Sequence, residues 1–495
     1  MLDQSFSDSN FNLIFLKENR KGSISKKHLN QEYFDKHEQF KTVLNEKIDL
    51  KKTRALTKEE LDSFAERLET INIAKEEIRN ELFAEYSKII NNEDNKFCFE
   101  IKYDKQNEIY TTKKDGVHFF ALKQLQRNLS KTFKVVQADR NRIIKQVYNL
   151  ISDGFPKVII RTDIHKFYES IPQKELFEKL ENNTLLSPLS KKLLKRLFFE
   201  FERIKDLSVM EVGRGIPRGF GVSAYLSELY MREIDNEIKS LPDLIYYARY
   251  VDDIIIIFSP KTKSQTRDYV TEIKKIINDG KLDINDNLDG RKDKTHKIEL
   301  FWDKSQNKTF NELHELTFLG YKFNITHFPK LPKTSIVLNL SDERLLRYKR
   351  RIELSILAYI KDSKYNEKRA RELLIDRFKF LCGNYCLNHN KKSISAGIYY
   401  SNKMLELSEL GDSLEKINEH KKDALEKIEV PPKIGIDKEK LKDFIENKFC
   451  FKKAFIERKN YFYSFKFNLE EEKYYTKQFK RVTNKFEVIK SIWKK

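Results

Sequence analysis

The spacing of hydrophobic and polar positions changes twice along the chain. In the first 120 residues the spacing is helical: residues 57–60 (Thr-Lys-Glu-Glu) have the form of a capping box, and Leu61, Phe64, Leu68 and Ile71 follow at helical intervals. This pattern predicts an amphipathic helix that packs on a larger body.

From about residue 120 to 335, short β-branched or aromatic runs alternate with helical stretches. The runs at 157–161 and 254–258 are typical of strands. Helical spacing then returns, with Ser341 as the expected N-cap of a long helix, and Pro431 and Pro432 interrupt it. The chain is therefore predicted to be an α+β protein whose central sheet region is followed by an all-α region. No repeat of fixed period is found, which leaves a helical-repeat solenoid open.

The composition adds a further prediction, namely that the protein has a polyanionic partner. Lys and Arg number 96 against 76 Asp and Glu, which gives a net charge of +20. Charged residues make up 35% of the chain, whereas about 25% is usual. No segment sets an apolar face against a basic one, so nucleic acid is favoured over an anionic membrane. The small numbers of Gly (14) and Pro (10) favour helices over turn-rich β folds.

The four cysteines, Cys98, Cys382, Cys386 and Cys450, are too scattered for a disulfide framework. Cys382 and Cys386 lie four residues apart, which fits one helix face better than a zinc site. The chain begins without a basic stretch ahead of an apolar one, and no run reaches the roughly 18 apolar residues that span a bilayer. We expect a cytoplasmic protein with no membrane contact.

The candidate chemistry lies in the central region. Asp252 and Asp253 stand together before an apolar strand, and their mutual repulsion requires a positive partner. Alone, this pair also fits a solvated hairpin turn. Asp163, however, ends a second apolar strand 89 residues upstream. Two strands that deliver carboxylates to one sheet edge can hold two Mg²⁺ ions about 4 Å apart, with Mn²⁺ as an alternative.

The central segments, taken in order, resemble the motifs of reverse transcriptases. These segments are 137–151 (fingers), 162–172 (motif A, TDIHKFYESIP), 215–231 (motif B, GIPRGFGVSAYLSELYM), 249–257 (motif C, RYVDDIIII), 291–300 (motif D) and 315–323 (motif E). The resemblance implies a right-hand polymerase fold. It places a helical extension and part of the fingers in residues 1–120, the fingers and palm in 121–335, and a helical, α-repeat-like C-terminal domain in 336–495.

The resemblance also implies roles for individual residues. Asp163 and Asp252 would be metal ligands, with the Ile164 carbonyl as a further ligand and Asp253 in support. Tyr168 matches the ring that excludes a 2′-hydroxyl, so the substrate would be a dNTP; its alternative is an ordinary core aromatic. The remaining implied contacts to the nucleotide are Arg140, Arg142, Lys145, Arg218, Gly219 and Lys294, and the implied primer grip is Leu319 and Gly320.

Several of these residues have alternatives or depart from the family. Arg218 stands where retroviral enzymes often have Gln, which puts base-pair sensing and template dependence in doubt. A solvated lysine explains Lys294 nearly as well as a contact to pyrophosphate does. The basic residues of 140–145 could equally form an exposed helix face. Gly215, Gly219 and Gly221 would permit close backbone approach to a nucleotide or template.

The flanks resemble bacterial antiphage reverse transcriptases, namely the abortive-infection and unknown-group defence-associated enzymes. This resemblance rests on motif B, motif C and residues 377–388 (RFKFLCGNYCLN). It implies assembly as trimers or hexamers, and synthesis that either copies a partner noncoding RNA or proceeds without template from a protein tyrosine. Candidate tyrosines are Tyr33, Tyr461, Tyr463, Tyr474 and Tyr475.

Two other readings stay open. A retron or group II intron enzyme would share the palm motifs, and a non-catalytic nucleic-acid-binding module would share the charge. The roughly 150 extra helical residues argue against the former, and the intact Asp163, Asp252 and Asp253 argue against the latter.

Overall fold

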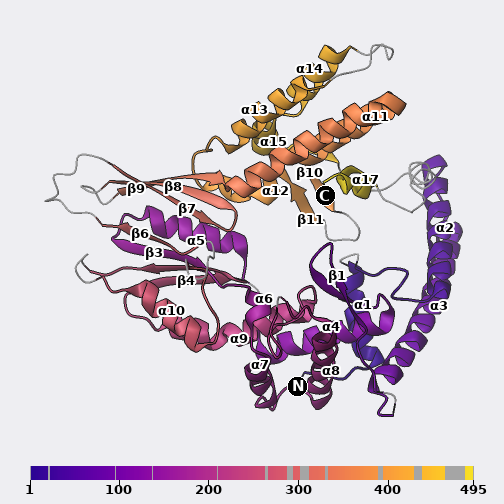
Figure 1. Ribbon diagram of the computed structural model, residues 1–495. Coiled ribbons are helices and arrows are strands. Elements are labelled where there is room, and N and C mark those ends of the chain that lie inside the picture. The colour runs from indigo at the N-terminus through magenta and orange to yellow at the C-terminus, as the bar shows by residue number, and fades with distance from the viewer. Residues whose placement is uncertain are drawn as a thin grey trace.

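A computed structural model shows two hydrophobic cores that share one central sheet. It describes residues 2–20, 23–94, 96–136, 138–208, 210–261, 266–286, 294–301, 311–328, 333–387, 394–428, 437–462 and 485–493. In Figure 1 the helices of the C-terminal part lie above the sheet, and two long N-terminal helices stand to one side. No helix in the described part of the chain is both long and apolar enough to cross a membrane.

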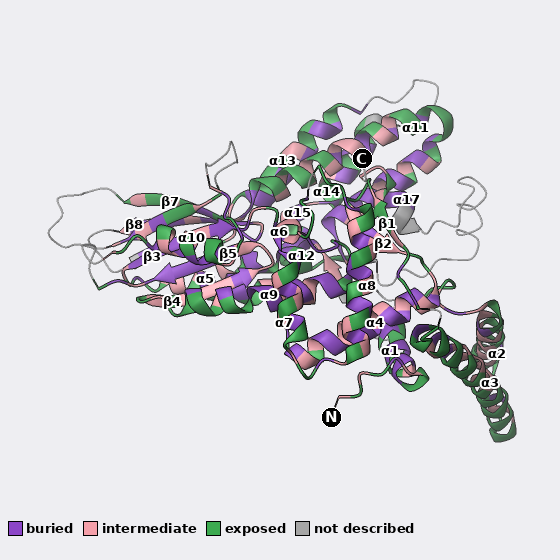
Figure 2. Ribbon diagram, turned by 60° about the horizontal axis from the view of Figure 1, so that its bottom comes forward, coloured by how far each residue is buried: buried purple, intermediate pink, exposed green. Residues whose placement is uncertain are grey.

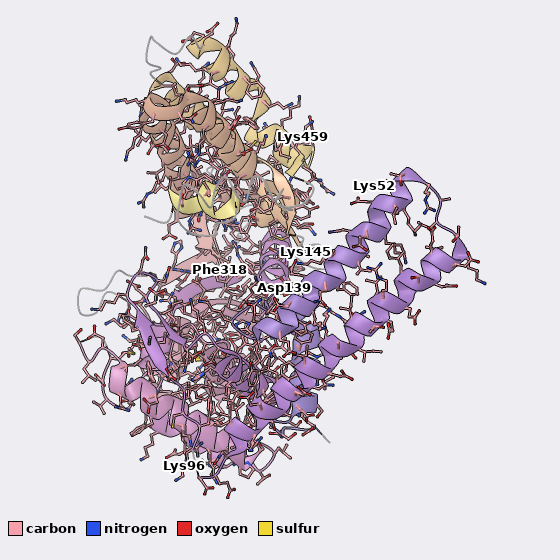
Figure 3. The ribbon with its side chains drawn as sticks, turned by 90° about the vertical axis from the view of Figure 1, so that its right-hand side faces the viewer. Lys52, Lys96, Asp139, Lys145, Phe318 and Lys459 are labelled. Atoms are coloured by element: carbon pink, nitrogen blue, oxygen red, sulfur yellow. The ribbon has the colours of Figure 1, made fainter. Side chains whose placement is uncertain are left out.

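The N-terminal part is a set of helices, of which two form a projecting arm. These helices are α1 (Asp8–Arg20), α2 (Gln31–Thr53) and α3 (Lys58–Asn91). The predicted capping box is confirmed, because the Thr57 hydroxyl accepts from the Glu60 amide and the Glu60 carboxylate accepts from the Thr57 amide. The helices α2 and α3 pack on each other and are largely exposed (Figure 2). Figure 3 shows Lys52, in the last turn of α2, at the end of this arm far from the body.

The central sheet carries the strands predicted from the apolar runs. Its strand order is β4-β5-β3-β6, with antiparallel neighbours. The strands are β3 (Lys157–Asp163), β4 (Leu244–Tyr250), β5 (Asp253–Phe258) and β6 (His296–Leu300). Side chains that alternate along β3 and β5 enter two different cores. One face meets α9 (Gly221–Lys239) and α10 (Tyr269–Asp279), and the other meets α5 (Arg140–Ser152).

A hairpin and four helices complete the first core. The hairpin β1 (Ile101–Asp104) and β2 (Ile109–Thr112) packs near α8, and α4 packs on α9. The helices are α4 (Gly116–Phe133), α6 (Phe167–Ser170), α7 (Gln173–Glu181) and α8 (Pro188–Ile204). Because α4 runs from residue 116 to 133, the expected boundary at 120 falls inside a helix.

A second antiparallel sheet, β7-β8-β9, leads into the C-terminal part. Its strands are β7 (Glu312–Phe318), β8 (Tyr321–Phe328) and β9 (Lys333–Leu340). The expected boundary at 335 therefore falls inside β9. Ser341 caps the next helix as predicted, since its side chain accepts from the Arg344 amide.

The C-terminal part is mostly helical, but the expectation that it is entirely helical was wrong. Its helices are α11 (Asp342–Cys382), α12 (Ile398–Asn402), η3 (Lys403–Leu407), α13 (Ser413–Glu426), α14 (Lys438–Lys448), α15 (Phe451–Ile456) and α17 (Lys485–Ser491). A small sheet, β11-β10-β12, joins β10 (Asn384–Leu387), β11 (Ile394–Gly397) and β12 (Asn460–Phe462). These strands have three or four residues each, and β10 pairs with a segment more than 70 residues away. Local spacing cannot reveal so short and distant a pairing.

Candidate active site

The turn between β4 and β5 presents Asp252 from a strained backbone. Tyr250 pairs with Asp253, so Val251 and Asp252 form a two-residue turn. Val251 has φ +63°, which is costly for a β-branched residue. The buried Arg249 guanidinium donates to the Val251 carbonyl at 2.9 Å, and it also binds Glu228 and Asp235. Arg249 therefore links the turn to α9.

The structure brings Asp163, Asp252 and Asp253 to one edge of the sheet. Asp163 pairs in register with Asp253, and the Ile164 amide donates to the Asp252 carbonyl at 3.1 Å. All three carboxylates line one cleft of about 700 Å³. Sequence reasoning had placed two strands with carboxylates at a common edge, and this juxtaposition is what the sheet register produces.

Cationic and amide groups hold two of the three carboxylates. The Lys294 ammonium donates to Asp163 Oδ2 at 2.5 Å, and Asn285 Nδ2 donates to Asp163 Oδ1 at 3.0 Å. Arg161 donates to Asp253 Oδ1 at 2.7 Å. Burial raises the pKa of Asp252, and the like charges of Asp253 and Asp163 raise it further.

This donor set fits a divalent cation. Ionisation of Asp252 is opposed by two neighbouring carboxylates, and a cation would relieve that opposition. Among the described residues, no group of three or more His, Cys, Asp or Glu side chains forms a ready metal cage. That is compatible with Mg²⁺, which protein sites usually hold through one or two carboxylates together with water and substrate phosphates.

Sequence reasoning missed two residues of this site. Asn285 bridges Asp163 and the His165 ring, whose Nδ1 lies 2.8 Å from Asn285 Oδ1, but nothing in its sequence context indicates this. Arg161 contacts both Asp253 and the Lys294 carbonyl. A charged residue directly after the apolar run 158–160 was the available signal for Arg161.

The predicted primer-grip residues also line the cleft. Leu319 and Gly320 form the β7–β8 turn, both with positive φ. Arg140 Nε donates to the Leu319 carbonyl at 2.9 Å, and the Ser341 amide donates to the Gly320 carbonyl at 3.1 Å. The guanidinium groups of Arg140 and Arg344 both lie over the Tyr321 ring. Arg140 thus holds this turn, and it is not among the residues that line the cleft.

The other predicted nucleotide contacts lie outside the cleft lining. Arg142 and Lys145 are exposed on α5. In Figure 3 Lys145 lies between the N-terminal body and the C-terminal helices. Tyr168 is half-buried, its hydroxyl lies close to Ser227, and burial raises its pKa. Arg218 is exposed and acts electrostatically on Tyr168.

The glycines of 215–221 approach the chain itself. A Cβ on Gly219, where φ is +113°, would lie 2.6 Å from the Tyr110 carbonyl oxygen of β2. Added Cβ atoms at Gly215 and Gly221 would meet Met210 and Gln126. Internal packing therefore already requires these glycines, and the expectation that they also make room for a nucleotide stays a prediction.

The tyrosine and cysteine candidates have ordinary packing roles where they are described. Tyr33 is buried against Phe15, and the Tyr461 hydroxyl donates to the Lys448 carbonyl at 2.9 Å. Burial raises the pKa of Tyr461 to about 12. Cys382 is buried with a free thiol. Tyr463, Tyr474, Tyr475 and the Cys386 side chain lie outside the described residues.

Residues 112–323 match the family model described as "Reverse transcriptase (RNA-dependent DNA polymerase)". The chain carries a reverse transcriptase domain. The three carboxylates, the β4–β5 turn and the β7–β8 turn all lie in this reverse transcriptase domain. The match assigns the domain as an RNA-directed DNA polymerase, and such domains generally use divalent metal ions.

Solved structures similar to the chain include three of yeast telomerase. Apo telomerase from Candida tropicalis, truncated from its C-terminal domain, has 17% identity over 41% of this chain and 42% of its own, with a TM-score of 0.27. Telomerases from Candida albicans and Candida tropicalis, each in complex with a TWJ fragment of telomeric RNA, have 13% and 14% identity. They cover 71% and 66% of this chain and 54% and 56% of their own, with TM-scores of 0.30 and 0.29. The chain thus spans about half the length of these structures, and no curated protein sequence matches it.

Proposed function

We propose that this protein synthesises DNA from dNTPs at the cleft formed by Asp163, Asp252 and Asp253. The observation that carries the proposal is the placement of three carboxylates at one sheet edge inside a reverse transcriptase domain. Asp163 and Asp252 would hold Mg²⁺ or Mn²⁺, with the Ile164 carbonyl as a further ligand and Asp253 in support. The bound ions would supply charge for activating the attacking hydroxyl and stabilising the leaving pyrophosphate.

The side chains around the carboxylates then have distinct tasks. Arg161 fixes Asp253, and Asn285 fixes Asp163. Lys294, whose ammonium already contacts Asp163, is suited to neutralise or protonate pyrophosphate once a cation takes over that carboxylate. Leu319 and Gly320 would support the primer terminus, and Tyr168 and Arg218 would border the nucleotide.

The biological setting belongs to the same proposal. The resemblance of motif B, motif C and residues 377–388 supports a role in antiphage defence. It also supports a nucleic-acid partner, either a copied noncoding RNA or only the DNA product, and a homo-oligomer of three or six chains. The net charge of +20 favours a polyanionic partner.

The test is incorporation of labelled dNTPs by the purified protein with Mg²⁺ or Mn²⁺. Asp252→Asn should fold normally and lose at least about 100-fold in rate, because removing one ligand charge costs several kcal/mol of transition-state stabilisation. Asp412→Asn is the matched control, since Asp412 is an exposed carboxylate on the C-terminal part that pairs with Lys416. Near-normal synthesis by Asp252→Asn would refute the proposed site.

The same reaction identifies the primer. A tyrosine hydroxyl can replace a primer 3′-hydroxyl as the nucleophile. Label that stays with denatured protein until protease is added would show protein priming. Label that extracts as free DNA or as extended RNA would show a nucleic-acid primer.

A further inference from the structure

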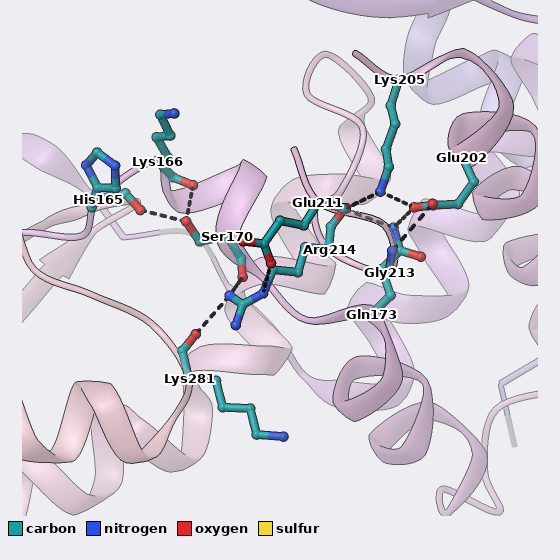
Figure 4. Close-up of polar contacts among 10 residues, drawn as sticks. All are labelled: His165, Lys166, Ser170, Gln173, Glu202, Lys205, Glu211, Gly213, Arg214 and Lys281. Carbon is teal, nitrogen blue, oxygen red and sulfur yellow. Dashed lines mark hydrogen bonds and ion pairs between the residues drawn. The ribbon is translucent and has the colours of Figure 1, made fainter. Parts of the chain in front are cut away.

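A buried lysine that does not line the catalytic cleft holds the loop of residues 210–216, which leads into motif B. The Lys205 side chain is completely inaccessible. Its ammonium donates to Glu202 Oε1 at 2.6 Å, to the Glu211 carbonyl at 2.5 Å and to the Arg214 carbonyl at 3.0 Å (Figure 4). All three N–H donors of the ammonium are therefore used, two of them on backbone carbonyls of the loop.

Gln173 and Glu202 complete this node. Gln173 Nε2 donates to the Gly215 carbonyl at 2.9 Å and to Glu202 Oε1 at 2.5 Å. The backbone N–H of Gln173 donates to the Gly213 carbonyl at 2.9 Å. The node consequently ties the loop to α7, which begins directly after motif A, and to the end of α8.

The loop lies against motif A. The Gly215 amide donates to the Ile171 carbonyl at 2.8 Å, and the Ile216 amide donates to the Tyr168 carbonyl at 2.8 Å. Arg214 adds a contact from the loop to the Ser170 carbonyl at 3.0 Å. The Tyr168 hydroxyl also lies close to Ser227 of motif B. The position of the Tyr168 ring thus depends on a loop whose own position depends on Lys205.

We infer that Lys205, Glu202 and Gln173 are positioning residues for the selection of deoxynucleotides over ribonucleotides, acting through Ile216 and Tyr168. The inference rests on the proposed function, in which Tyr168 faces the sugar. None of the three residues lines the catalytic cleft, so their effect is on sugar selection and on dNTP binding rather than on the carboxylates.

The test compares Lys205→Met with Lys157→Met. Lys157 is a matched control because its side chain is equally inaccessible and binds Asp153 and the Leu150 carbonyl, at the end of β3 opposite Asp163. Lys205→Met should raise the KM for dNTP and lower the dNTP-to-NTP ratio of kcat/KM, each by roughly 10-fold, because small misplacements of a positioning group cost about this much or more. Both variants should lower the melting temperature of the protein to a similar extent. Lys157→Met should leave the dNTP-to-NTP ratio of kcat/KM unchanged.

If Lys205→Met does not fold, Arg214→Met tests whether the loop affects the selection of dNTP over NTP. Arg214 is partly exposed, and its substitution removes only the contacts of its side chain, such as that to Ser170. It should lower the dNTP-to-NTP ratio in the same direction. Wild-type ratios in the recovered variants would overturn the inference while leaving the proposed function intact. A wild-type protein that incorporates no dNTP would instead overturn the proposed function, and this inference with it.

Discussion

Single substitutions can separate the contributions of the Tyr168 hydroxyl and the Tyr168 ring. Its hydroxyl lies close to Ser227, while its ring is packed beside Phe167. If the ring also excludes a 2′-hydroxyl, Tyr168→Ala should raise NTP use relative to dNTP by about 10-fold or more, as expected when a steric discrimination worth 1–3 kcal/mol is lost. Competition between labelled dNTP and NTP measures this change.

Tyr168→Phe is the control for this prediction. It removes the hydroxyl and keeps the ring, so the sugar preference should stay near that of the wild type. An unchanged preference in Tyr168→Ala would return Tyr168 to a purely structural role. A change in both variants would instead assign the discrimination to the hydroxyl.

The three carboxylates that the sequence predicted to meet at one sheet edge have local signals. Asp163 ends an apolar strand, and Asp252 and Asp253 precede another, so the pleat and register of two strands suffice to bring them together. Asn285 and Arg249 act through contacts with residues 122 and 14 to 21 positions away. Their roles follow from the fold and could not be read from spacing.

At the scale of elements, the β7–β8 turn is fixed by backbone conformation and by two arginines. Gly320 has φ +75°, and an added Cβ would lie 2.7 Å from Arg344 Cδ and 2.9 Å from Arg140 Nη2. Gly320→Ala should therefore destabilise the protein by about 1–2 kcal/mol from the left-handed backbone alone, and by more because both arginines must move. Urea denaturation measures the loss.

Gly213→Ala isolates the backbone contribution. Gly213 has φ +74°, and an added Cβ there would meet nothing within 4 Å. It should cost only the conformational part, about 1 kcal/mol. Equal losses in the two variants would show that Arg140 and Arg344 do not constrain the turn.

Helix and strand patterns predicted most elements but not where α5 would pack. The segment 137–151 was expected among the fingers, with its basic residues on a triphosphate. In the structure α5 covers the face of the central sheet opposite α9, because Ile143, Ile144, Val147 and Ile151 form an apolar stripe that meets Ile159, Ile255 and Ile257. The stripe was visible in the sequence; the surface it would cover was not.

At the scale of the whole molecule, the charge predicts how the proposed nucleic-acid partner would be bound. The affinity should fall steeply with salt, with a slope of log K against log salt of about 0.7 to 0.9 for each phosphate neutralised. If the exposed face of α5 contacts phosphates, replacing Arg142 and Lys145 with Gln should reduce the slope by about 0.7 to 0.9 per residue. Fluorescence anisotropy with a labelled RNA at several salt concentrations measures it.

Lys51 and Lys52 provide the comparison for the salt slope. Both lie in the last turn of α2, outside the cleft lining, and Figure 3 shows Lys52 at the end of the arm. Their replacement with Gln should leave the slope unchanged. A flat salt dependence of the wild type would contradict an interface dominated by the phosphate backbone. A slope that falls only when the arm is changed would move the binding surface to the arm.

The second core also bears on modularity. Ile159, Ile255 and Ile257 of the central sheet belong to the same apolar cluster as Ile352 of α11, Ile417 of α13 and Phe451 of α15. A chain cut after residue 323, where the family match ends, would lose β9 and η3, which pack on α5, and the C-terminal helices that share this core, and it would expose the apolar side chains they cover to water. We therefore expect that the catalytic region cannot be moved alone into another protein by recombination or engineering, because the helices that follow it complete its hydrophobic core.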